Sequence, residues 1–572
     1  MDNFYKDNDD MRFHLQEMDL KEIIEMKEDR FADFEKYADA PENAEEALEN
    51  YGEILELVGE IAGEYLFPMA ADVDTRGAVY ENGTVIYARG TEESIDRLKK
   101  ANLMGFTTPR KYGGLNLPKI IYSMAIELIS MADASFMTIF GLQEIAETIN
   151  HFGSDEQRDR YLPLFSKGEV LGAMALTEPD AGSDLPSVKM KASQDEKGNW
   201  FLNGVKRFIT NGCAQVLLVM ARSEEDIDDA RGLSLFIYRR DENMKIRRIE
   251  DKFGIHGSPT CELQFDNAPA ELLGVRKRGL IKYTMSLMNG ARLGVSAQAV
   301  GIAEAAYREA RSYASKRIQF SQKIDSFPPV YEMLTDMKVN IEASRSLLYE
   351  ASQIVDLKEG LDKKILLHPE LKFELKNRLR KFDNLESLFT PMLKCYVTEM
   401  GNRICYDALQ VHGGVGYTRD FIIERLCRDM RITSIYEGTT QLQVVAAIGA
   451  LLKGFASERI EDYESMYDFS SIPDLFSPVR EFKVKLEKSL EYIKGCDDQR
   501  LRDYHARRLV EMGADTIISY LLLISAIGSM RKKTVARIFI SKAEYRINHS
   551  MNYILSGDKS LIDGFEDVIK TS

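Results

Sequence analysis

The chain has 572 residues, 44% hydrophobic and 29% charged, which is ordinary for a globular protein and too long for a single core. Its 75 basic and 91 acidic residues give a net charge of −16, so nucleic acid, which needs a basic face, is not expected as the main partner. The first fifty residues hold 17 acids and 6 bases, a balance of −11. The stretch from Arg500 to Arg546 is the local basic exception, and a polyanion contact there stays open as an alternative.

The sequence has few of the features expected of a signal peptide, a membrane-spanning helix or a metal site. The start, "MDNFYKDNDDMRF", is acidic where a signal peptide is basic and then apolar, so we expect a cytoplasmic protein. The longest apolar run, residues 516–530, falls short of the ~20 residues of a membrane span and predicts a buried helix. The six cysteines form no CxxC pair and the seven histidines no HExxH motif, so we expect buried thiols in a reducing compartment and no metal site.

The predicted elements change character twice along the chain. Apolar residues at three- and four-residue steps, as in "NAEEALENYGEILELVGEIAGEYLFPMAADV", predict helices in the first part. Short runs rich in β-formers then follow, such as "NWFLNGVKRFIT" and "VLLVMARS", and predict an antiparallel β domain before helices return. The predicted fold is α+β and multidomain: an acidic N-terminal extension (1–50), an N-terminal helical domain (51–171), a central β domain (172–275), a C-terminal four-helix bundle (276–455) and an additional helical domain (456–572).

Two short stretches carry residues suited to binding and chemistry. "MALTEPDAGSD", Met174–Asp184, places hydroxyls beside alanine and glycine, which let backbone N–H groups approach a ligand closely. "IYEGTTQ" places Glu437 between an aromatic residue and a glycine. By itself that glutamate is either a solvated turn residue or a general base in a closed pocket.

The stretches "LTEPDAGSD", "NGVKRFITNG", "RIQF", "QVHGGVGY" and "IYEGTTQ" occur in this order. Together they resemble the flavin-dependent acyl-CoA dehydrogenases over about residues 50–455. That family has the same helical, β, helical order, and the added tail resembles its larger branch. The resemblance implies FAD as cofactor, an acyl-CoA substrate, electron-transfer flavoprotein as electron acceptor, and a homodimer or homotetramer without a membrane span.

The resemblance also implies which residues form the site. The "TEPDAGSD" stretch and the "RFITNG" stretch would lie on two sides of the flavin ring, with Phe208 where relatives often carry tryptophan. The implied cofactor contacts are Met174, Leu176, Thr177, Ser183, Phe208, Ile209, Thr210, Arg317, Gln319, Phe320, Gln410, Gly413, Gly414, Thr439 and Gln441. The implied substrate contacts are Ser183, Asn289, Arg292, Tyr436 and Gly438. His412, inside "QVHGGVGY", is expected to be structural.

In this family the position of Glu437 is that of the catalytic base. It would remove the α-proton of the thioester while a β-hydride goes to flavin N5, giving a trans-2-enoyl-CoA. A carboxylate in an apolar, closed pocket loses hydration, its pKa rises, and it becomes a better base. Some relatives carry the base on an earlier helix, but the matching stretch here, "LMNGARLG", has no acid. Two alternatives stay open: an acyl-CoA oxidase that uses oxygen, and a DNA-binding flavoprotein of the alkylation-response type.

Overall fold

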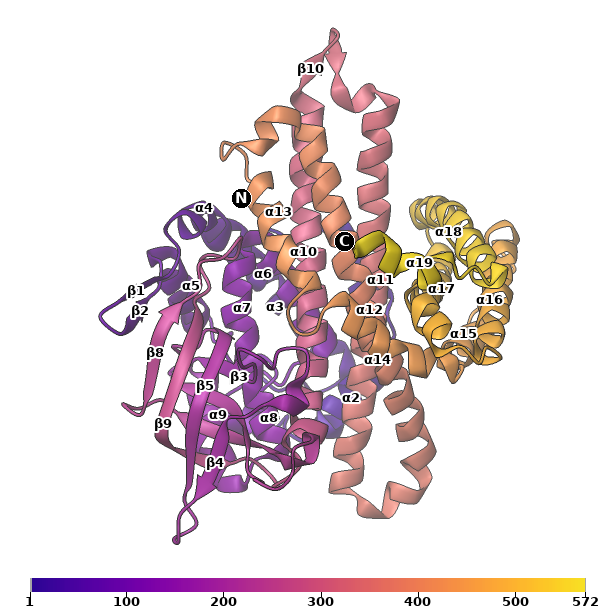
Figure 1. Ribbon diagram of the computed structural model, residues 1–572. Coiled ribbons are helices and arrows are strands. Elements are labelled where there is room, and N and C mark those ends of the chain that lie inside the picture. Colours follow the sequence, from indigo (N-terminus) through magenta and orange to yellow (C-terminus); the bar gives the residue numbers. More distant parts are fainter. Residues whose placement is uncertain (1–2, 571–572) are drawn as a thin grey trace. The chain divides into compact units, whose positions relative to one another are not determined.

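The computed structural model describes residues 3–570, which form two compact units. Unit 1 holds the residues up to 306 together with 413–433, and unit 2 holds 307–412 and the residues from 434 onward. Helix α10 (Met285–Lys316) begins in unit 1 and ends in unit 2. The helical, β, helical order and the added C-terminal helices confirm the predicted fold class (Figure 1).

The N-terminal part of unit 1 is a layer of helices around α6, which is buried along its whole length. The acidic first fifty residues pack on this layer, because Leu15 and Ile24 are buried and Glu28 forms a buried ion pair with Arg110. The elements are α1 (Asp9–Glu17), α2 (Lys21–Lys27), α3 (Ala44–Ile61), α4 (Phe67–Arg76), the hairpin β1 (Val79–Glu81) and β2 (Thr84–Ile86), α5 (Arg89–Lys100), α6 (Lys119–Ala132), α7 (Ala134–Gly141), α8 (Ile145–Phe152) and α9 (Asp155–Ser166).

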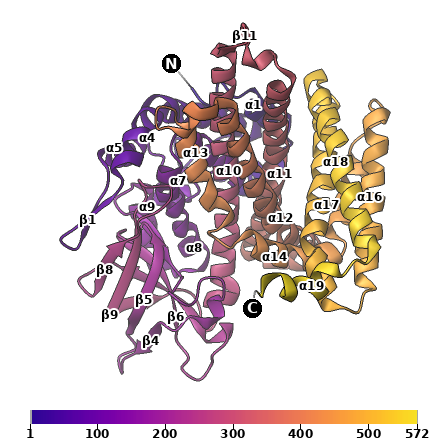
Figure 2. The same cartoon turned by 45° about the horizontal axis from the view of Figure 1, so that its top comes forward.

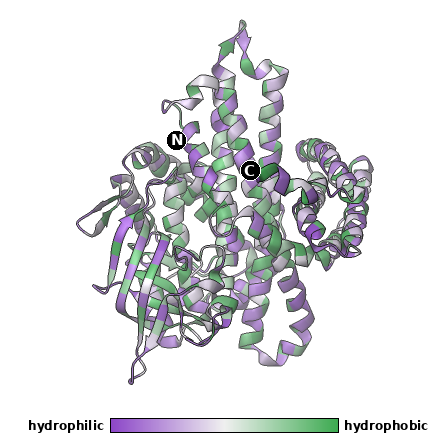
Figure 3. Cartoon of the chain, viewed as in Figure 1, coloured by the Kyte–Doolittle hydropathy of each residue, from purple (hydrophilic) through white to green (hydrophobic). Residues whose placement is uncertain are grey.

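A β domain completes most of unit 1. Its strands are β3 (Gly172–Ala175), β4 (Lys191–Gln194), β5 (Trp200–Thr210), β6 (Val216–Arg222), β7 (Leu233–Arg239), β8 (Met244–Ile249) and β9 (Thr260–Leu272). Strand β7 pairs with both β9 and β6, so the sheet closes on itself. Hydrophobic and hydrophilic residues are interspersed along the outer strands, as expected where one face meets solvent (Figure 3). The pairing is antiparallel as predicted, except that β3 and, at one residue pair, β4 run parallel to β6.

Helix α13 (Ile423–Arg431) returns to unit 1 and is fixed there by buried polar contacts. The backbone N–H of Ile255 donates to Asp429 Oδ1 at 2.6 Å. Burial raises the pKa of Asp429 to about 7, although the Arg425 guanidinium opposes the shift. Asp429 is therefore a buried carboxyl group whose charged form is disfavoured in the fold.

Unit 2 is built on two long antiparallel helices, α11 (Pro328–Leu367) and α12 (Lys372–His412). The other elements are the hairpin β10 (Ile318–Gln319) and β11 (Gln322–Lys323), α14 (Thr440–Leu452), α15 (Phe455–Met466), α16 (Pro473–Lys494), α17 (Gln499–Ala526), α18 (Met530–Ser556) and α19 (Ser560–Ile569). Helices α16, α17 and α18 lie side by side as the core of the additional domain (Figure 2).

The apolar run predicted as a buried helix lies mainly in α17. This helix is long and apolar enough to cross a membrane by composition, but 83% of its apolar window is buried inside the protein. Burial of that extent is typical of a core helix, which confirms the prediction. The helix ends at Ala526, four residues before the apolar run does, because "IGS" forms the turn into α18, which begins at Met530.

Buried ion pairs attach the additional helices to the long pair. Glu342 on α11 is fully buried, and its carboxylate accepts hydrogen bonds from Arg531 at 3.0 Å and Lys532 at 2.9 Å. Asp515 on α17 likewise accepts from Tyr396 of α12 and from Arg546 of α18. Several bases of the stretch from Arg500 to Arg546 are thus paired with acids of the same unit, which weakens the polyanion alternative.

Candidate functional site

The stretch from Met174 to Asp184 leaves strand β3 and folds into a tight turn. Glu178 and Ala181 exchange two backbone hydrogen bonds, at 3.1 and 3.2 Å. Leu176 is buried, Thr177 is half-buried and Ser183 is exposed. The turn therefore presents hydroxyl groups and small residues to the outside, as the sequence predicts for a ligand-binding loop.

Lys206 on β5 holds this turn in place by hydrogen bonds. It is fully buried, and its ammonium donates to the carbonyl of Leu176 at 2.8 Å and to Glu178 Oε1 at 2.9 Å. Burial lowers the pKa of Lys206 to about 8, while the Glu178 carboxylate opposes the shift. Since the N–H of Arg207 also donates to the carbonyl of Thr177 at 3.0 Å, the structure brings together the two stretches expected to meet the flavin.

A bulge in β5 turns Phe208 outward. The register between β5 and β9 shifts between Lys206 and Ile209, and Phe208 has a φ of +59°, a left-handed conformation that is costly for a bulky residue. As a result Phe208 is 51% exposed and Ile209 is buried at 2%. Phe208 therefore offers a half-exposed ring, over which the Arg207 guanidinium lies 4.6 Å from the centroid, whereas the Ile209 side chain is buried. Thr210, next along the strand, is half-buried.

Two of the expected substrate residues of unit 1, Asn289 and Arg292, lie one turn apart on α10. The Arg292 guanidinium, which is buried, donates to Asn289 Oδ1 at 2.9 Å. Asn289 thus helps to orient Arg292. Gly413 and Gly414, also in unit 1, are exposed, and Gly413 has a φ of +64° that favours glycine.

In unit 2 three expected cofactor residues lie on or beside the β10–β11 hairpin. Its two-residue turn consists of Phe320 and Ser321, with φ values of +49° and +65°, where asparagine and glycine are usually found. Phe320 is 90% exposed, and Arg317 and Gln319 are exposed as well. The hairpin thus exposes a phenylalanine on a turn whose two residues both have left-handed conformations.

Glu437 lies in a turn that leads into α14. Glu437 and Gly438 have consecutive left-handed conformations, with φ of +53° and +91°. The φ of Gly438 favours glycine, and a Cβ atom added there would lie 2.5 Å from Nε2 of Gln443, so that amide would have to move. Tyr436, Glu437 and Gly438 are all half-buried, which separates Glu437 from a fully solvated surface glutamate.

The residues after this turn begin α14. Thr439 is the N-cap, and its hydroxyl accepts from the N–H of Leu442 at 3.4 Å. Gln441 is exposed on the first turn of the helix, and Gln410, near the end of α12, is exposed too. His412 is buried and stacked on Tyr313 at 4.6 Å, as a structural residue would be.

Sequence reasoning did not single out Lys206, Lys394 or Gln443. Lys206 stood inside the quoted stretch "NGVKRFITNG", where a lysine in a β-forming run was the available signal. Lys394 donates to the carbonyl of Gly438 at 2.7 Å, and Gln443 donates to the carbonyls of Glu437 and Gly438 at 3.1 Å. Lys206 and Lys394 contact carbonyl groups 30 and 44 residues away along the chain, a separation that no local pattern reveals, whereas Gln443 follows the turn directly.

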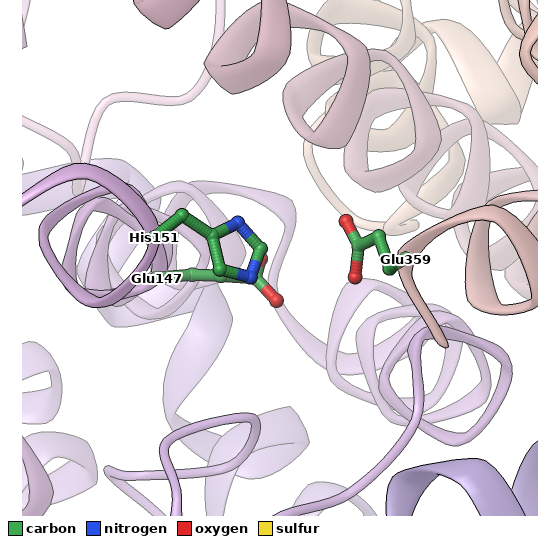
Figure 4. A group of neighbouring side chains, drawn as sticks. All are labelled: Glu147, His151 and Glu359. Atoms are coloured by element: carbon green, nitrogen blue, oxygen red, sulfur yellow. The ribbon is translucent and has the colours of Figure 1, made fainter. Parts of the chain in front are cut away.

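Glu147 and His151 lie one turn apart on α8 (Figure 4). Although burial disfavours its charge, Lys119 and His151 hold the pKa of Glu147 at about 2. The Lys119 ammonium also contacts Glu144. A carboxylate that a buried ammonium already neutralises is a poor cation ligand, and Glu359, also labelled in Figure 4, belongs to unit 2. We therefore propose no metal site on α8.

Sequence profiles of one family match nearly the whole described chain. Those of the N-terminal, middle and C-terminal domains of acyl-CoA dehydrogenase match residues 49–169, 173–268, and 278–368 with 374–450. A further profile, acyl-CoA dehydrogenase C terminal, matches residues 453–559. The chain belongs to the acyl-CoA dehydrogenase family.

Individual relatives agree with this assignment. The chain is 32% identical over 439 residues, 71% of its own length and 72% of the relative's, to 3-methylmercaptopropionyl-CoA dehydrogenase of Ruegeria pomeroyi. A solved structure described as an electron transferring flavoprotein of Acidaminococcus fermentans aligns with a TM-score of 0.61 and 32% identity over 70% of this chain and 97% of that one. An acyl-CoA dehydrogenase of Bacillus anthracis complexed with FAD aligns with a TM-score of 0.75 over 92% of both chains, but its 22% identity shows the fold alone.

The protein is accordingly an FAD-dependent oxidoreductase of the acyl-CoA dehydrogenase type. Its own residues fit that cofactor, since the half-exposed ring of Phe208 suits stacking on an aromatic group, and Thr177 and Ser183 supply hydroxyls on the adjoining turn. On unit 2 the exposed Arg317 offers forked donors suited to a pyrophosphate.

Proposed function

We propose that this protein desaturates an acyl-CoA between its α and β carbons, with Glu437 as the base that removes the α-proton. The observation that carries the proposal is the left-handed Glu437–Gly438 turn, half-buried and held by donors from Lys394 and Gln443. A glutamate kept in an unfavourable conformation by its surroundings is what a positioned base requires, and a solvated turn residue does not.

The remaining residues suit binding and orientation. Bound FAD supplies the two-electron acceptor for the β-hydrogen. We assign Arg292, which donates to Asn289 on α10, the role of a substrate contact, and Tyr436 and Gly438 flank the base. The turn after β3, fixed by Lys206, holds Ser183 where it is available to ligands. The product is a trans-2-enoyl-CoA, and the α-proton stays on the Glu437 carboxylate until it is released to solvent.

Electron-transfer flavoprotein is the proposed electron acceptor, and the resemblance to the Acidaminococcus fermentans structure supports it. The strained, exposed hairpin of Phe320 supports a homo-oligomer, because a surface of this kind suits contact with a second copy. Fast reoxidation of the reduced protein in air would favour the oxidase alternative instead.

The test is an anaerobic titration of the purified, FAD-containing protein with butyryl-, octanoyl- and palmitoyl-CoA. Loss of the oxidised flavin absorbance with one chain length in the wild type, but not in Glu437→Gln, is the expected result. If Glu437→Gln bleaches as fast as the wild type, Glu437 is not the base. If none of the three thioesters bleaches the flavin, the substrate class proposed here is wrong.

A further inference from the structure

The turn that carries Glu437 does not hold its conformation by itself. A left-handed conformation brings the Cβ atom of a glutamate close to the following carbonyl oxygen, so isolated chains avoid it. Here Glu437 has a φ of +53°, and it is followed by Gly438 at +91°, a conformation that costs glycine little. Surrounding groups must therefore keep the turn in place.

Two buried side chains direct their donors at the carbonyl groups of this turn. The ammonium of Lys394, which is 0% exposed, donates to the carbonyl of Gly438 at 2.7 Å. The amide of Gln443, which is 1% exposed, donates to that carbonyl and to the carbonyl of Glu437, each at 3.1 Å. The Gly438 carbonyl thus accepts two hydrogen bonds, one of them from a charged group.

Neither side chain is a natural choice for packing alone. Lysine and glutamine are rarely fully buried, because their polar groups lose hydration that the protein must replace. Among the residues that the structure describes, Oε1 of Gln443 has no hydrogen-bond partner, so the contacts that the structure gives this amide are the two to the turn. Burial at such a cost indicates a specific task.

Helix α12 supplies a rigid support for both ends of the turn. Lys394 lies in the middle of this 41-residue helix, and further along the same helix Glu399 accepts a hydrogen bond at 2.6 Å from the hydroxyl of Thr440. Thr440 is the first residue of α14, directly after the turn. A catalytic group mounted on packed helices is held more precisely than one on a free loop.

We propose that Lys394 and Gln443 are positioning residues that hold the left-handed Glu437–Gly438 turn and so aim the Glu437 carboxylate. The inference rests on the proposed function, in which Glu437 is the base. Lys394 acts through the backbone of Gly438, and Gln443 acts through both carbonyls. Neither has to touch the substrate.

The experiment compares Lys394→Met with Lys532→Met in the full-length, FAD-containing protein. Lys532 is a matched control, because it is also a buried lysine of unit 2 (3% exposed) but donates to Glu342. We expect Lys394→Met to lower kcat by about 10- to 100-fold, the loss typical of a misplaced reacting group, with little change in KM or flavin content. Lys532→Met should lower thermal stability and leave kcat near that of the wild type.

Two further readouts separate positioning from a general structural role. The double variant Lys394→Met with Glu437→Gln should react no more slowly than Glu437→Gln alone. If Lys394 acts only by positioning the Glu437 carboxylate, its removal has no further effect once that carboxylate is absent. Hydrogen–deuterium exchange in the peptide spanning residues 434–443 should be faster in Lys394→Met than in the wild type or in Lys532→Met. Gln443→Met should show the same pattern as Lys394→Met.

Each outcome has a definite meaning. If Lys394→Met keeps the wild-type kcat and exchange while Glu437→Gln is inactive, the positioning inference is overturned and the proposed function stands. Equal losses from Lys394→Met in the presence and absence of the Glu437 carboxylate also overturn it. If Glu437→Gln is fully active, the base assignment fails, and the positioning inference fails with it.

Discussion

Replacing Lys206 by methionine should destabilise the β domain in a way that can be traced to one buried ion pair. Lys206 is fully buried on β5 and donates to the carbonyl of Leu176 and to the carboxylate of Glu178. Methionine has a side chain of similar length and no donor. The variant therefore keeps the packing but leaves the Glu178 carboxylate, which is 8% exposed, without its counter-ion.

The structure also sets the size of the effect. Removing one partner of a buried ion pair costs about 3–5 kcal/mol, because the remaining charge is uncompensated. Glu178 keeps two backbone donors, the N–H groups of Lys189 at 2.8 Å and Met190 at 2.9 Å. We therefore expect the lower end, about 3 kcal/mol.

Removing both charges should recover most of this loss. Burial lowers the pKa of Lys206 to about 8 despite the attraction of Glu178, so desolvation of the ammonium outweighs the ion pair. The double variant Lys206→Met with Glu178→Gln buries no charged group, and the Gln amide oxygen can still accept from one of the two backbone N–H groups, which bond to different oxygens of Glu178. Its free energy of unfolding should lie closer to the wild type than to the single variant.

The single tryptophan of the chain reports this unfolding directly. Trp200 lies on the same strand as Lys206, is 7% exposed and packs against Phe236 with ring centroids 5.3 Å apart. Urea unfolding followed by tryptophan fluorescence therefore measures the β domain. Lys191→Met on β4 is the control, because that side chain is 70% exposed and its removal should change little. If Lys206→Met and Lys191→Met unfold at the same urea concentration, or the double variant is less stable than Lys206→Met, the reasoning is wrong.

Three further predictions concern other parts of the molecule. Gly438→Ala should lower kcat strongly without loss of bound FAD, because Gly438 has a φ of +91° and the new Cβ atom would lie 2.5 Å from Nε2 of Gln443. Steady-state kinetics at matched flavin content test this prediction. Full activity of the variant would show that the turn tolerates a side chain. The pKa of Asp429 is raised from about 4 in the unfolded chain to about 7 in the fold, so the stability that its protonated form confers is complete below about pH 4 and is lost as the pH rises through about 7. Asp429→Asn should therefore gain thermal stability over the wild type as the pH rises across that interval, and a constant difference between the two would contradict the assignment. Glu342→Gln should destabilise the additional domain by about 3–5 kcal/mol by leaving Lys532 buried without its carboxylate; limited proteolysis should then cleave after residue 456 first, and unchanged resistance would argue against this role.

Much of the fold could be predicted from local pattern. Helical periodicity and β-forming runs are properties of neighbouring residues, so the sequence indicated the helical, β, helical order and the added helices that the structure has. The motifs likewise pointed to the family, because five stretches in a set order are specific even where each alone is not. The domain boundaries and the roles of the individual site residues stay predictions.

Tertiary structure decided which distant residues act on the predicted ones. The parallel pairing of β3 with β6 depends on how the chain crosses between strands, and alternation within a strand does not encode it. Sequence placed Glu437 in a turn beside a glycine, but its left-handed conformation is held by Lys394, which lies 44 residues before Gly438. Lys206 likewise donates to the carbonyl of Leu176, which lies 30 residues earlier in the chain. Local propensity describes only neighbouring residues, whereas a buried donor meets its acceptor only after separate elements have packed and excluded water.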